Sequence, residues 1–369
     1  MKKYMFIIPS LSKGGAEKVV SILSNQLVED KRKVIIITHF KTENEYKLNN
    51  NVKVICLSNL YENEYRKKIS IFYLIKLLYK LRKNIEKEKP DYILPFLWTT
   101  CIRTDLSLMF SKYKKNVIQT VRNNPKVFPK NKLLKKYRDF LIKKSTMTIV
   151  QNAEQKQYFK EKLQEKIKIL PNPVSKDVSD IQHQENGYIN IIGVGRLEEQ
   201  KNFELLIRAF SEVYKKDKNV RLKIYGEGSK RYELQNIIEQ LNISSVAKLC
   251  GRSNDYLEIY GDATIYVLSS EFEGMPNTLL EAMATGLPCI STDCPTGPRD
   301  IIINNENGIL INRNNIQELA NAILLVISDT DLKNKISKNA RETIKNNYSV
   351  SLITKKLIQN CEGIEENDK

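Results

Sequence analysis

Short apolar runs alternate with longer amphipathic segments along most of this chain, and no other feature constrains the fold as strongly. In the first half the apolar runs have the length of buried strands and occupy residues 4–9, 33–38, 52–57, 91–96, 116–121 and 147–152. Between the first two runs, Val19, Leu23 and Leu27 recur at helical spacing. Strands that alternate with helices predict a parallel sheet that is covered by helices on both faces.

The alternation starts again after Pro171-Asn172-Pro173, a stiff and non-helical segment. The alternation restarts with the segment 190–197, and later strands are predicted at residues 221–226, 246–251, 264–270 and 288–292, with helices at 202–216 and 230–242. We therefore predict an α/β protein with two Rossmann-like, doubly wound domains, residues 1–172 and 173–348, that face a cleft. Ligands of such sheets bind at the carboxyl ends of the strands.

The length of 369 residues is sufficient for two domains, and no apolar run approaches the roughly 18 residues that a membrane-spanning helix needs. The first apolar run contains Pro9 and lacks a small-residue cleavage site, so it is predicted to be a strand rather than a signal peptide. The six cysteines are scattered, as expected for reduced thiols in a cytoplasmic protein. His39 and His183 are the only histidines, which argues against a histidine-based metal site.

The net charge of +17 is concentrated in the first half, because residues 1–172 carry +22 and residues 173–369 carry −5. Within the segments 61–89 and 111–144, Lys and Arg alternate with Leu, Ile, Phe and Tyr, a composition typical of surfaces that bind anionic membranes. Solvated helix faces are the alternative interpretation. No nucleic-acid recognition motif is present, and the aromatic side chains are expected to face the core, so nucleic-acid binding is not predicted.

The segment GVGRLEEQKNFELL follows a predicted strand and has two of the three glycines of a dinucleotide-binding turn. The third would occupy position 198, but Glu198 stands there, and a carboxylate beside a pyrophosphate is unfavourable. Arg196 instead lies just beyond the strand, and Lys201 precedes a helix whose N-terminus carries partial positive charge. The two cations predict an anion site suited to a diphosphate; two solvated loop residues are the alternative.

The segment EFEGMPNTLLEAMATGLP contains two glutamates around a polar turn. Glu273 lies in the turn beyond a predicted strand, and Glu281 lies about one turn inside the following helix. Pro276 suits the start of that helix, which Asn277 or Thr278 can cap. The two carboxylates can form a clamp for hydroxyl groups, an acid/base pair, or a solvated helix start.

Backbone N–H groups around this turn, including those of Met275, Asn277 and Thr278, are expected to point into the same pocket. Gly14 and Gly15 lie between the first strand and the first helix, where a glycine backbone can approach a phosphate closely. A plain tight turn is the alternative for these two glycines.

Four motifs in this order, GGAE, PNPV, GRLEEQKN and EFEGMPNTLLEAMATGLP, resemble those of the family 4 retaining glycosyltransferases of the GT-B fold. The resemblance covers essentially the whole chain. It implies that the C-terminal domain binds a nucleotide sugar and the N-terminal domain binds an acceptor. The segment SVSLITKKLIQNC resembles the helix that crosses back to the first domain, here residues 349–362.

For the donor, the resemblance implies that Arg196 and Lys201 neutralise the diphosphate and stabilise the leaving nucleoside diphosphate. Glu273 would bind hydroxyls of the donor sugar, and Glu281 would bind the ribose. The donor-binding backbone would include Gly274, Met275, Pro276, Asn277 and Thr278, with Gly14 and Gly15 on the other side of the cleft. No metal or other cofactor is implied, since the two cations supply the positive charge.

The chain departs from the family on the acceptor side. Many members have a histidine after the strand that corresponds to YILPF, whereas this chain reads PFLWTTCIRTDL there. We therefore expect Thr99 and Thr100 to supply sugar or acceptor contacts in its place. The segment QTVRNNPKVF resembles a stretch of bacterial members that extend lipid-linked glycans. This resemblance implies that Arg122 and Asn123 are acceptor-side or donor-adjacent residues.

The resemblance implies transfer of a hexose or N-acetylhexosamine, with retention, from a UDP-linked sugar to a glycan acceptor carried on polyprenyl diphosphate. Such an enzyme would build bacterial capsule or O-antigen polysaccharide, as a cytoplasmic protein on the inner face of the cell membrane. Two alternatives remain open from the residues. One is a non-catalytic protein of this fold that binds a membrane or a partner, and the other is a glycoside hydrolase that uses both glutamates.

Overall fold

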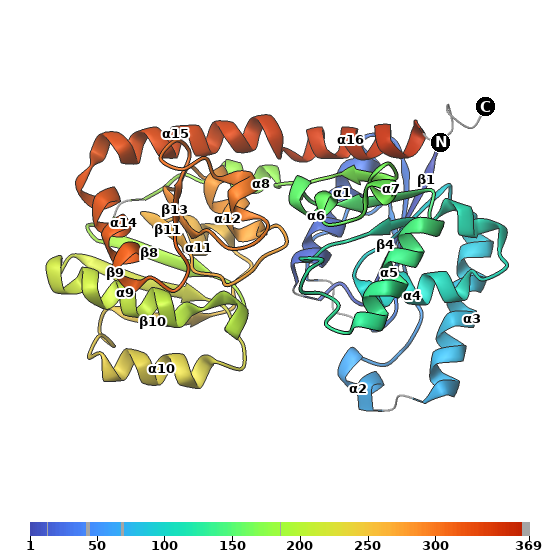
Figure 1. The fold of residues 1–369 in the computed structure, drawn as a ribbon, viewed down its shortest axis with the longest axis horizontal. Coiled ribbons are helices and arrows are strands. Elements are labelled where there is room, and N and C mark those ends of the chain that lie inside the picture. The colour runs from blue at the N-terminus through green and yellow to red at the C-terminus, as the bar shows by residue number, and fades with distance from the viewer. Residues whose placement is uncertain (13, 42–44, 68–69, 185, 364–369) are drawn as a thin grey trace. The chain divides into compact units, whose positions relative to one another are not determined.

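The computed structural model describes residues 1–12, 14–41, 45–67, 70–184 and 186–363. The chain forms two compact units (Figure 1). Unit 1 comprises Met1–Pro173 together with the chain from Val350 onward, and unit 2 comprises Val174–Ser349. Each unit is an α/β sandwich built on parallel strands, as the alternation of apolar runs predicts.

Unit 1 contains two parallel sheets. The first has the strand order β3-β2-β1-β4 and the second has the order β5-β6-β7, and a bridge between Ile93 and Val117 connects them. The strands are β1 (Lys3–Ile8), β2 (Lys33–Thr38), β3 (Val52–Cys56), β4 (Tyr92–Pro95), β5 (Ile118–Thr120), β6 (Met147–Val150) and β7 (Ile167–Ile169). Strand β1 is central, since Phe6 pairs with Ile36 on one side and Leu94 on the other.

Successive residues of β1 serve opposite faces of the sheet. Tyr4, Phe6 and Ile8 pack in one core with helices α1 and α16, while Met5 and Ile7 pack in another core with α3. The helices of unit 1 are α1 (Gly15–Glu29), α2 (Glu62–Lys67), α3 (Ile71–Glu88), α4 (Trp98–Ser107), η1 (Lys112–Asn116), α5 (Lys132–Lys144), α6 (Ala153–Gln157), α7 (Glu161–Gln164) and α16 (Val350–Glu362).

Unit 2 contains one six-stranded parallel sheet with the order β10-β9-β8-β11-β12-β13. Its strands are β8 (Ile189–Val194), β9 (Val220–Tyr225), β10 (Ala247–Gly251), β11 (Ile265–Leu268), β12 (Cys289–Thr292) and β13 (Ile309–Ile311). The chain winds outward from β8 in one direction and then from β11 in the other. The loops after β8 and β11 therefore leave the sheet side by side, where doubly wound sheets bind ligands.

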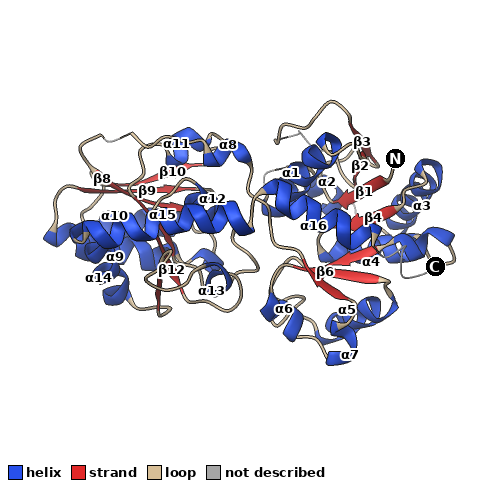
Figure 2. Ribbon diagram, turned by 90° about the horizontal axis from the view of Figure 1, so that it is seen from above, coloured by secondary structure: helices blue, strands red, loops and turns tan. Residues whose placement is uncertain are grey.

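Helices cover both faces of this sheet (Figure 2). Ile191 of β8 packs with α9, α10 and α14, and the next residue, Ile192, packs with α8, α11, α12 and α15. The helices of unit 2 are α8 (Lys176–Ser179), η2 (Glu199–Lys201), α9 (Phe203–Lys216), α10 (Arg231–Gln240), α11 (Tyr256–Tyr260), α12 (Asn277–Ala284), α13 (Pro298–Ile301), α14 (Ile316–Ser328) and α15 (Thr330–Asn347). Among the described residues, no helix combines the length and apolarity needed to cross a bilayer.

The prediction that aromatic side chains of the basic segments face the core is wrong for several of them. Phe72 and Tyr79 of α3 are 68% and 65% exposed, and Phe140 of α5 is 49% exposed. The reason lies in the helical repeat. Helix α3 buries one narrow stripe that includes Leu77 and Leu81, so apolar residues on its other side remain in solvent.

Candidate active site

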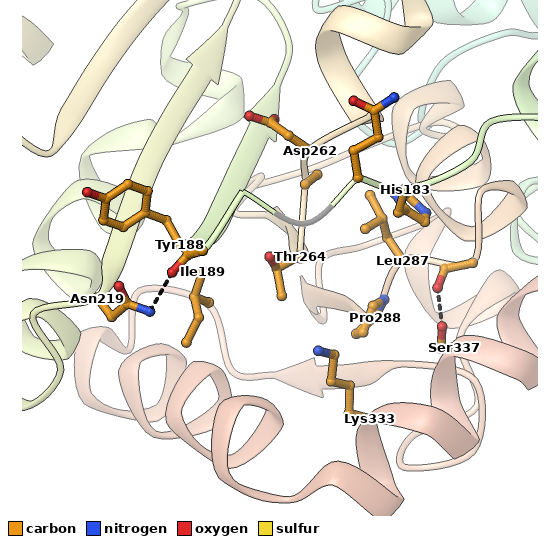
Figure 3. A pocket seen from close by; sticks show the side chains of 14 residues that line it. His183, Tyr188, Ile189, Asn219, Asp262, Thr264, Leu287, Pro288, Lys333 and Ser337 are labelled. Carbon is orange, nitrogen blue, oxygen red and sulfur yellow. Dashed lines mark hydrogen bonds between the residues drawn. The ribbon is translucent and has the colours of Figure 1, made fainter.

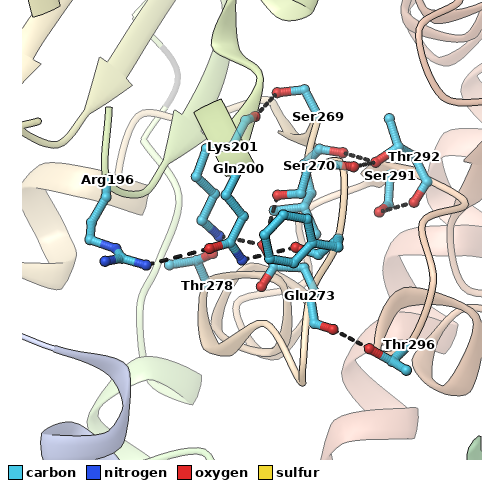
Figure 4. Close-up of polar contacts among 12 residues, drawn as sticks. Arg196, Gln200, Lys201, Ser269, Ser270, Glu273, Thr278, Ser291, Thr292 and Thr296 are labelled. Atoms are coloured by element: carbon cyan, nitrogen blue, oxygen red, sulfur yellow. Dashed lines mark hydrogen bonds and ion pairs between the residues drawn. The ribbon is translucent and has the colours of Figure 1, made fainter. Parts of the chain in front are cut away.

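Loops at the carboxyl edge of the unit 2 sheet bring three of the predicted donor residues, Arg196, Lys201 and Glu273, together (Figure 4). The loop after β8 carries Arg196 and Lys201, and the turn after β11 carries Glu273. The loop after β12 packs against that turn, because Glu273 N donates to Pro295 O and the Thr296 hydroxyl donates to Glu273 O. The sheet order thus assembles residues that are about 70 positions apart in sequence.

Lys201 and Glu273 form an ion pair at the centre of this site. Lys201 Nζ lies 2.8 Å from Glu273 Oε1, and the two side chains are only 13% and 8% exposed. The Ser270 hydroxyl donates to the same carboxylate oxygen over 2.7 Å. Lys201 ends η2 just before Asn202, whose side chain accepts from Leu205 N and caps α9. The cation is therefore fixed beside the N-terminus of a helix, as predicted, but the sequence pattern did not indicate its contact with Glu273.

Arg196 is exposed and lies on the same loop. Its Nη2 donates to Gln200 Oε1 over 3.4 Å, and Gln200 Nε2 donates to Phe272 O over 2.9 Å. Gln200 also accepts, through its backbone oxygen, from Glu271 N. Gln200 consequently connects Arg196 to the turn that carries Glu273, and the guanidinium remains accessible to a solvent-borne anion.

A Gly-Glu-Gly segment after β9 supports the Arg196 loop and was not predicted. A Cβ on Gly226 would lie 1.7 Å from Gly195 O, and a Cβ on Gly228 would lie 2.3 Å from Leu197 O. Both positions therefore require glycine so that the two backbones can touch. The signal in the sequence is the pair of glycines directly beyond a predicted strand.

Glu198 connects the same two loops. Its carboxylate accepts from the backbone N–H and the hydroxyl of Ser229, at 3.0 and 2.8 Å. These hydrogen bonds lower the pKa of Glu198, which keeps it ionised. The residue that argues against a dinucleotide-binding turn thus has a structural use of its own.

Glu281 lies in α12 and is buried, at 6% exposure. The Tyr260 hydroxyl donates to Glu281 Oε2 over 3.1 Å. Burial raises the pKa of Tyr260 well above its usual value, so this phenol stays protonated and remains a donor. The carboxylate of Glu281 is therefore oriented by Tyr260, a residue that the sequence pattern did not indicate.

The start of α12 differs from the prediction. Pro276 occupies the N-cap position without a side-chain cap, and the helix begins at Asn277. Neither Asn277 nor Thr278 caps it; the Thr278 hydroxyl instead lies 2.8 Å from the Tyr266 hydroxyl. Thr278 is the second residue after the N-cap, and its side chain contacts strand β11 rather than the first free N–H groups of the helix. Gly274, Met275 and Pro276 are all buried in the turn.

Thr296 and Gly297 hold the Glu273 turn from the loop after β12. Thr296 has φ = 61°, which is unusual for a β-branched residue, and Gly297 has φ = 88°. A Cβ on Gly297 would lie 2.9 Å from Pro276 Cδ. Nearby, burial and the Glu273 carboxylate raise the pKa of the Cys294 thiol to about 12, so it is not a thiolate nucleophile.

In unit 1, Gly14 is the N-cap of α1 and has an extended backbone, and Gly15 is the first residue of that helix. The Tyr46 hydroxyl accepts from Gly14 N over 3.2 Å and donates to Gly14 O over 3.0 Å. A phosphate could receive the Gly14 N–H only if Tyr46 released it. The predicted close backbone approach at this turn is therefore made here by a tyrosine of the chain itself.

The predicted acceptor-side residues fall into two groups. Thr99 is exposed on α4, but Thr100 is fully buried on the inner side of that helix and is not placed to contact a substrate, which corrects the prediction. The Arg122 guanidinium stacks 4.9 Å from the Phe96 ring centroid and donates to Asn172. Burial lowers the pKa of Arg122 to about 9.

Asn123 is half-buried, and its side-chain oxygen accepts from the N–H of the next residue, Asn124, over 2.8 Å. A histidine also reaches this part of unit 1, although none lies in the segment after β4. His39, at the end of β2, lies with Nδ1 3.0 Å from Arg103 Nη1 of α4. Burial and the Arg103 charge lower the pKa of His39 to about 3, so it remains neutral.

The arrangement of the carboxylates does not resemble that of a glycosidase pair. Glu273 is held by a lysine and Glu281 accepts from a buried tyrosine, so each is already bound to a different donor. In the part of the chain that the structure describes, no cluster of three His, Cys, Asp or Glu side chains could hold a metal ion. The site offers cations and hydroxyl-binding carboxylates at one sheet edge.

Two family profiles match consecutive parts of the chain. The profile described as "Glycosyltransferase Family 4" matches residues 13–178, and the profile described as "Glycosyl transferases group 1" matches residues 175–343. Together the two profiles span residues 13–343, and the chain belongs to the family 4, group 1 type of glycosyltransferases, with the GT-B fold. It is therefore a transferase, and the edge of the unit 2 sheet described above is the candidate donor site of a glycosyltransferase.

The chain is also similar to individual glycosyltransferases and to solved structures. An uncharacterized glycosyltransferase of Methanocaldococcus jannaschii is 34% identical over 63% of this chain, which spans 62% of that relative's length. A Campylobacter jejuni α-1,4-N-acetyl-D-galactosaminyltransferase, named for the acceptor GalNAc-α-(1→4)-GalNAc-α-(1→3)-diNAcBac-PP-undecaprenol, is 28% identical over 97% of this chain and 98% of its own. Staphylococcus aureus TarM, solved as a mutant with fondaparinux, α-GlcNAc-glycerol and UDP, has a TM-score of 0.79 at 18% identity, covering 98% of this chain and 100% of its own.

Proposed function

We propose that this glycosyltransferase transfers a hexose or N-acetylhexosamine, with retention, from a UDP-sugar to a glycan carried on polyprenyl diphosphate. The observation that carries the proposal is the contact of Lys201 with Glu273 at the carboxyl edge of the unit 2 sheet. A diphosphate-binding cation and a hydroxyl-binding carboxylate then lie where the diphosphate and the sugar of one donor would meet. UDP in the related TarM structure and the undecaprenol-linked acceptor of the Campylobacter relative support the two substrate classes.

The leaving diphosphate would be stabilised by charge that is already in place. Lys201 is fixed by its ion pair and Arg196 is accessible on the same loop. The N–H groups at the start of α9 add partial positive charge. Preorganised charges of this kind stabilise a transition state without reorganising water. A diphosphate oxygen would then accept the proton of the incoming hydroxyl, and no metal or other cofactor is required.

The sugar and the nucleoside would be held by separate carboxylates. Glu273, at the turn, would accept from hydroxyls of the donor sugar, and Glu281, in α12, would accept from the ribose. Tyr260 donates to Glu281 Oε2 over 3.1 Å and so orients the carboxylate. The Thr278 hydroxyl and the backbone of 274–277 border the same turn.

We further propose that unit 1 docks on the anionic inner face of the cell membrane. Phe72, Ile75 and Tyr79 are spaced by three and four residues along α3, so they share one face, and each is more than half exposed. Lys76 and Lys83 are exposed beside them. An apolar stripe bordered by lysines is the composition of a surface helix that inserts shallowly among anionic lipids.

Helix α5 has a second face of the same kind. Leu133 and Phe140 are separated by two turns and are 73% and 49% exposed, with Lys136 and Lys144 nearby on the helix. Each lysine near an anionic surface contributes about 1 kcal/mol of attraction. Such docking would place the acceptor-binding unit close to a polyprenyl-linked glycan.

The experiment that tests the catalytic proposal is a panel of nucleotide sugars incubated with the protein and a polyprenyl-diphosphate glycan. Nucleoside diphosphate release that requires both a UDP-sugar and the acceptor, with an α-configured product from an α-linked donor, is the expected result. Release that needs no acceptor would indicate hydrolysis of the donor. Cleavage of a simple glycoside without nucleotide would support a hydrolase that uses Glu273 and Glu281, and the proposal would then be wrong.

A further inference from the structure

His183 lies at the amino-terminal edge of the unit 2 sheet, away from the loops that carry the donor site. It lines a cavity of about 360 Å³, together with residues from the starts of β8, β11 and β12 and from α15 (Figure 3). The residue as a whole is exposed. Next to it, Gln184 N donates to Gly261 O, which fixes this segment against the end of α11.

Both ring nitrogens of His183 face backbone carbonyl oxygens. Nδ1 lies 3.0 Å from Tyr260 O, at the last residue of α11, and Nε2 lies 2.8 Å from Thr285 O, at the C-cap of α12. Carbonyl oxygens only accept hydrogen bonds, and a neutral imidazole carries a single hydrogen. The geometry is therefore satisfied on both sides only by the imidazolium ion. A neutral ring would hold one helix end and present a bare nitrogen to the other.

The two helix ends that His183 joins carry the two partners of the proposed ribose clamp. Tyr260, whose carbonyl meets Nδ1, donates its hydroxyl to Glu281 Oε2 over 3.1 Å. Thr285, whose carbonyl meets Nε2, follows Glu281 by one helical turn, and Thr285 N donates to Glu281 O. One imidazolium thus spans the backbone of the residue that orients the carboxylate and the backbone of the helix that carries it.

We propose that His183 is a pH-sensitive positioning residue for the Tyr260–Glu281 pair, an inference that rests on the proposed donor-binding role of Glu281. Protonated His183 fixes α11 and α12 at their C-terminal ends, where a positive charge also interacts favourably with a helix. Loss of the second ring hydrogen releases one end and loosens the alignment of Tyr260 with Glu281. Nucleotide binding should then weaken as the pH rises across the range in which histidine side chains ordinarily lose their charge.

The other charged groups around His183 do not reproduce this behaviour. Arg341 of α15 donates to the same Thr285 oxygen, and Lys333 of α15 borders the cavity; both side chains are basic. Asp262, after α11, accepts from Lys223 and Asn186. Glu281 accepts from the Tyr260 hydroxyl. Histidine is the type of side chain whose ordinary change of charge falls between about pH 5 and about pH 8.

The test compares wild-type protein with His183→Arg and His183→Gln. The arginine keeps a positive charge and several donors at every pH, whereas glutamine has no charge. The affinity for UDP, and for GDP and ADP if UDP does not bind, is measured by calorimetry between about pH 5.5 and about pH 8.5. We expect wild type to match the arginine variant at low pH and to bind about two- to tenfold more weakly than it at high pH. At low pH, the His183→Gln variant should bind the nucleotide more weakly than either wild type or His183→Arg.

Comparison at each pH removes the titration of the nucleotide itself, which is the same for every variant. His39 is the only other histidine, and its pKa of about 3 excludes it from this range. A ratio of wild-type to arginine-variant affinity that stays constant across the range would overturn the inference while leaving the proposed function intact.

A folded wild-type protein that binds none of the nucleotides would instead contradict the proposed function. Amide hydrogen exchange then tests His183 alone. Protection of residues 257–264 and 281–287, corrected for intrinsic exchange, should fall with rising pH in wild type and stay level in His183→Arg. Equal profiles in the two proteins would refute the positioning role.

Discussion

Lys201 Nζ lies 2.8 Å from Glu273 Oε1, so the cation assigned to the donor diphosphate is held by the carboxylate assigned to the donor sugar. Both side chains are largely withdrawn from water, at 13% and 8% exposure. In such surroundings each charge depends on the other, because a lone buried charge is costly. The pair therefore links the stability of the site to its chemistry, and the two must be measured separately.

The first prediction concerns stability. Replacing Glu273 with Gln, or Lys201 with Met, should lower the free energy of unfolding by about 3 kcal/mol, since each leaves one buried charge unpaired. The double variant should lose less than the sum of the two, because neither charge remains. Chemical denaturation measures all three. The exposed pair Lys215–Glu212 serves as the control. There the effect of the double variant on the unfolding free energy should equal the sum of the two single effects, so the coupling energy is near zero. Equal coupling energies at both pairs would contradict this account.

The second prediction concerns the loop after β12. Thr296→Val removes the hydroxyl that donates to Glu273 O while keeping the shape of the side chain, and Thr296→Ser keeps the hydroxyl. A lost hydrogen bond of this kind is worth about 1 kcal/mol, so kcat/KM should fall about fivefold in the valine variant and recover in the serine variant. Equal activity of the two variants would show that the hydroxyl does not position Glu273.

The third prediction concerns Tyr260. Tyr260→Phe deletes the donor to Glu281 without emptying the core, so the carboxylate loses its orientation. We expect the dissociation constant for UDP to rise about tenfold, as for a hydrogen bond to a charged group worth roughly 1.5 kcal/mol. Calorimetry provides the measurement, and Tyr232→Phe, at a position 79% exposed on α10, is the control. Unaltered affinity in Tyr260→Phe would separate Glu281 from nucleotide binding.

Much of the fold follows from the sequence, because strands buried on both faces must be continuous apolar runs. The runs at β1, β2, β8 and β11 are of this kind, and the restart after Pro173 marks the boundary between the two units. The short strand β13 (Ile309–Ile311) was not indicated, since three residues carry too little pattern. The aromatic residues of α3 were misplaced because composition alone does not tell which side of a helix is buried.

The site was predicted at the level of elements rather than contacts. Glu273 lies in a turn and Glu281 one turn inside a helix, as their spacing indicates. The contacts of Lys201 with Glu273 and of Tyr260 with Glu281 join different elements, and they depend on which strands are neighbours in the sheet. The Thr296 contact depends further on a left-handed backbone that no sequence pattern marks in a β-branched residue.

The fourth prediction concerns the return of the chain to unit 1. Arg32 donates to both oxygens of Glu362 on α16, at 2.8 and 3.0 Å, and the Tyr4 hydroxyl donates to it at 3.1 Å. Partial burial opposes ionisation, but these hydrogen bonds prevail and lower the pKa of Glu362. An acid with a lowered folded-state pKa stabilises the fold above its unfolded pKa, and that stability is lost as the pH falls through the folded pKa.

Glu362→Gln should therefore cost about 1 to 2 kcal/mol of unfolding free energy at neutral pH and almost nothing in acid, below the titration of the carboxylate. Thermal unfolding at a series of pH values provides the measurement. Glu86→Gln, in an exposed pair with Arg82, should change stability little at any pH. A pH-independent difference between wild type and Glu362→Gln would be inconsistent with the ion pair.

The fifth prediction concerns membrane docking by α3. Co-sedimentation with vesicles of anionic lipid should be strong at about 0.05 M salt and weak at about 0.5 M, and weak at both with zwitterionic lipid. The double variant Phe72→Ser/Tyr79→Ser should bind anionic vesicles more weakly than wild type, and its affinity for nucleotide should be unchanged. Tyr232→Ser in unit 2 is the control for removal of an exposed aromatic ring. Binding of the protein to anionic vesicles that is the same at both salt concentrations would refute an electrostatic docking surface.

The most direct test of the central claim is the acceptor-dependent rate of nucleoside diphosphate release by Lys201→Ala, compared with wild type and with Lys215→Ala. If Lys201 stabilises the leaving diphosphate, kcat should fall by about 10² to 10³, as for one preorganised charge-stabilising group, in protein whose folding is verified by its unfolding transition. Lys215→Ala, at an exposed position on α9, should keep full activity. Unchanged turnover in folded Lys201→Ala would contradict the account.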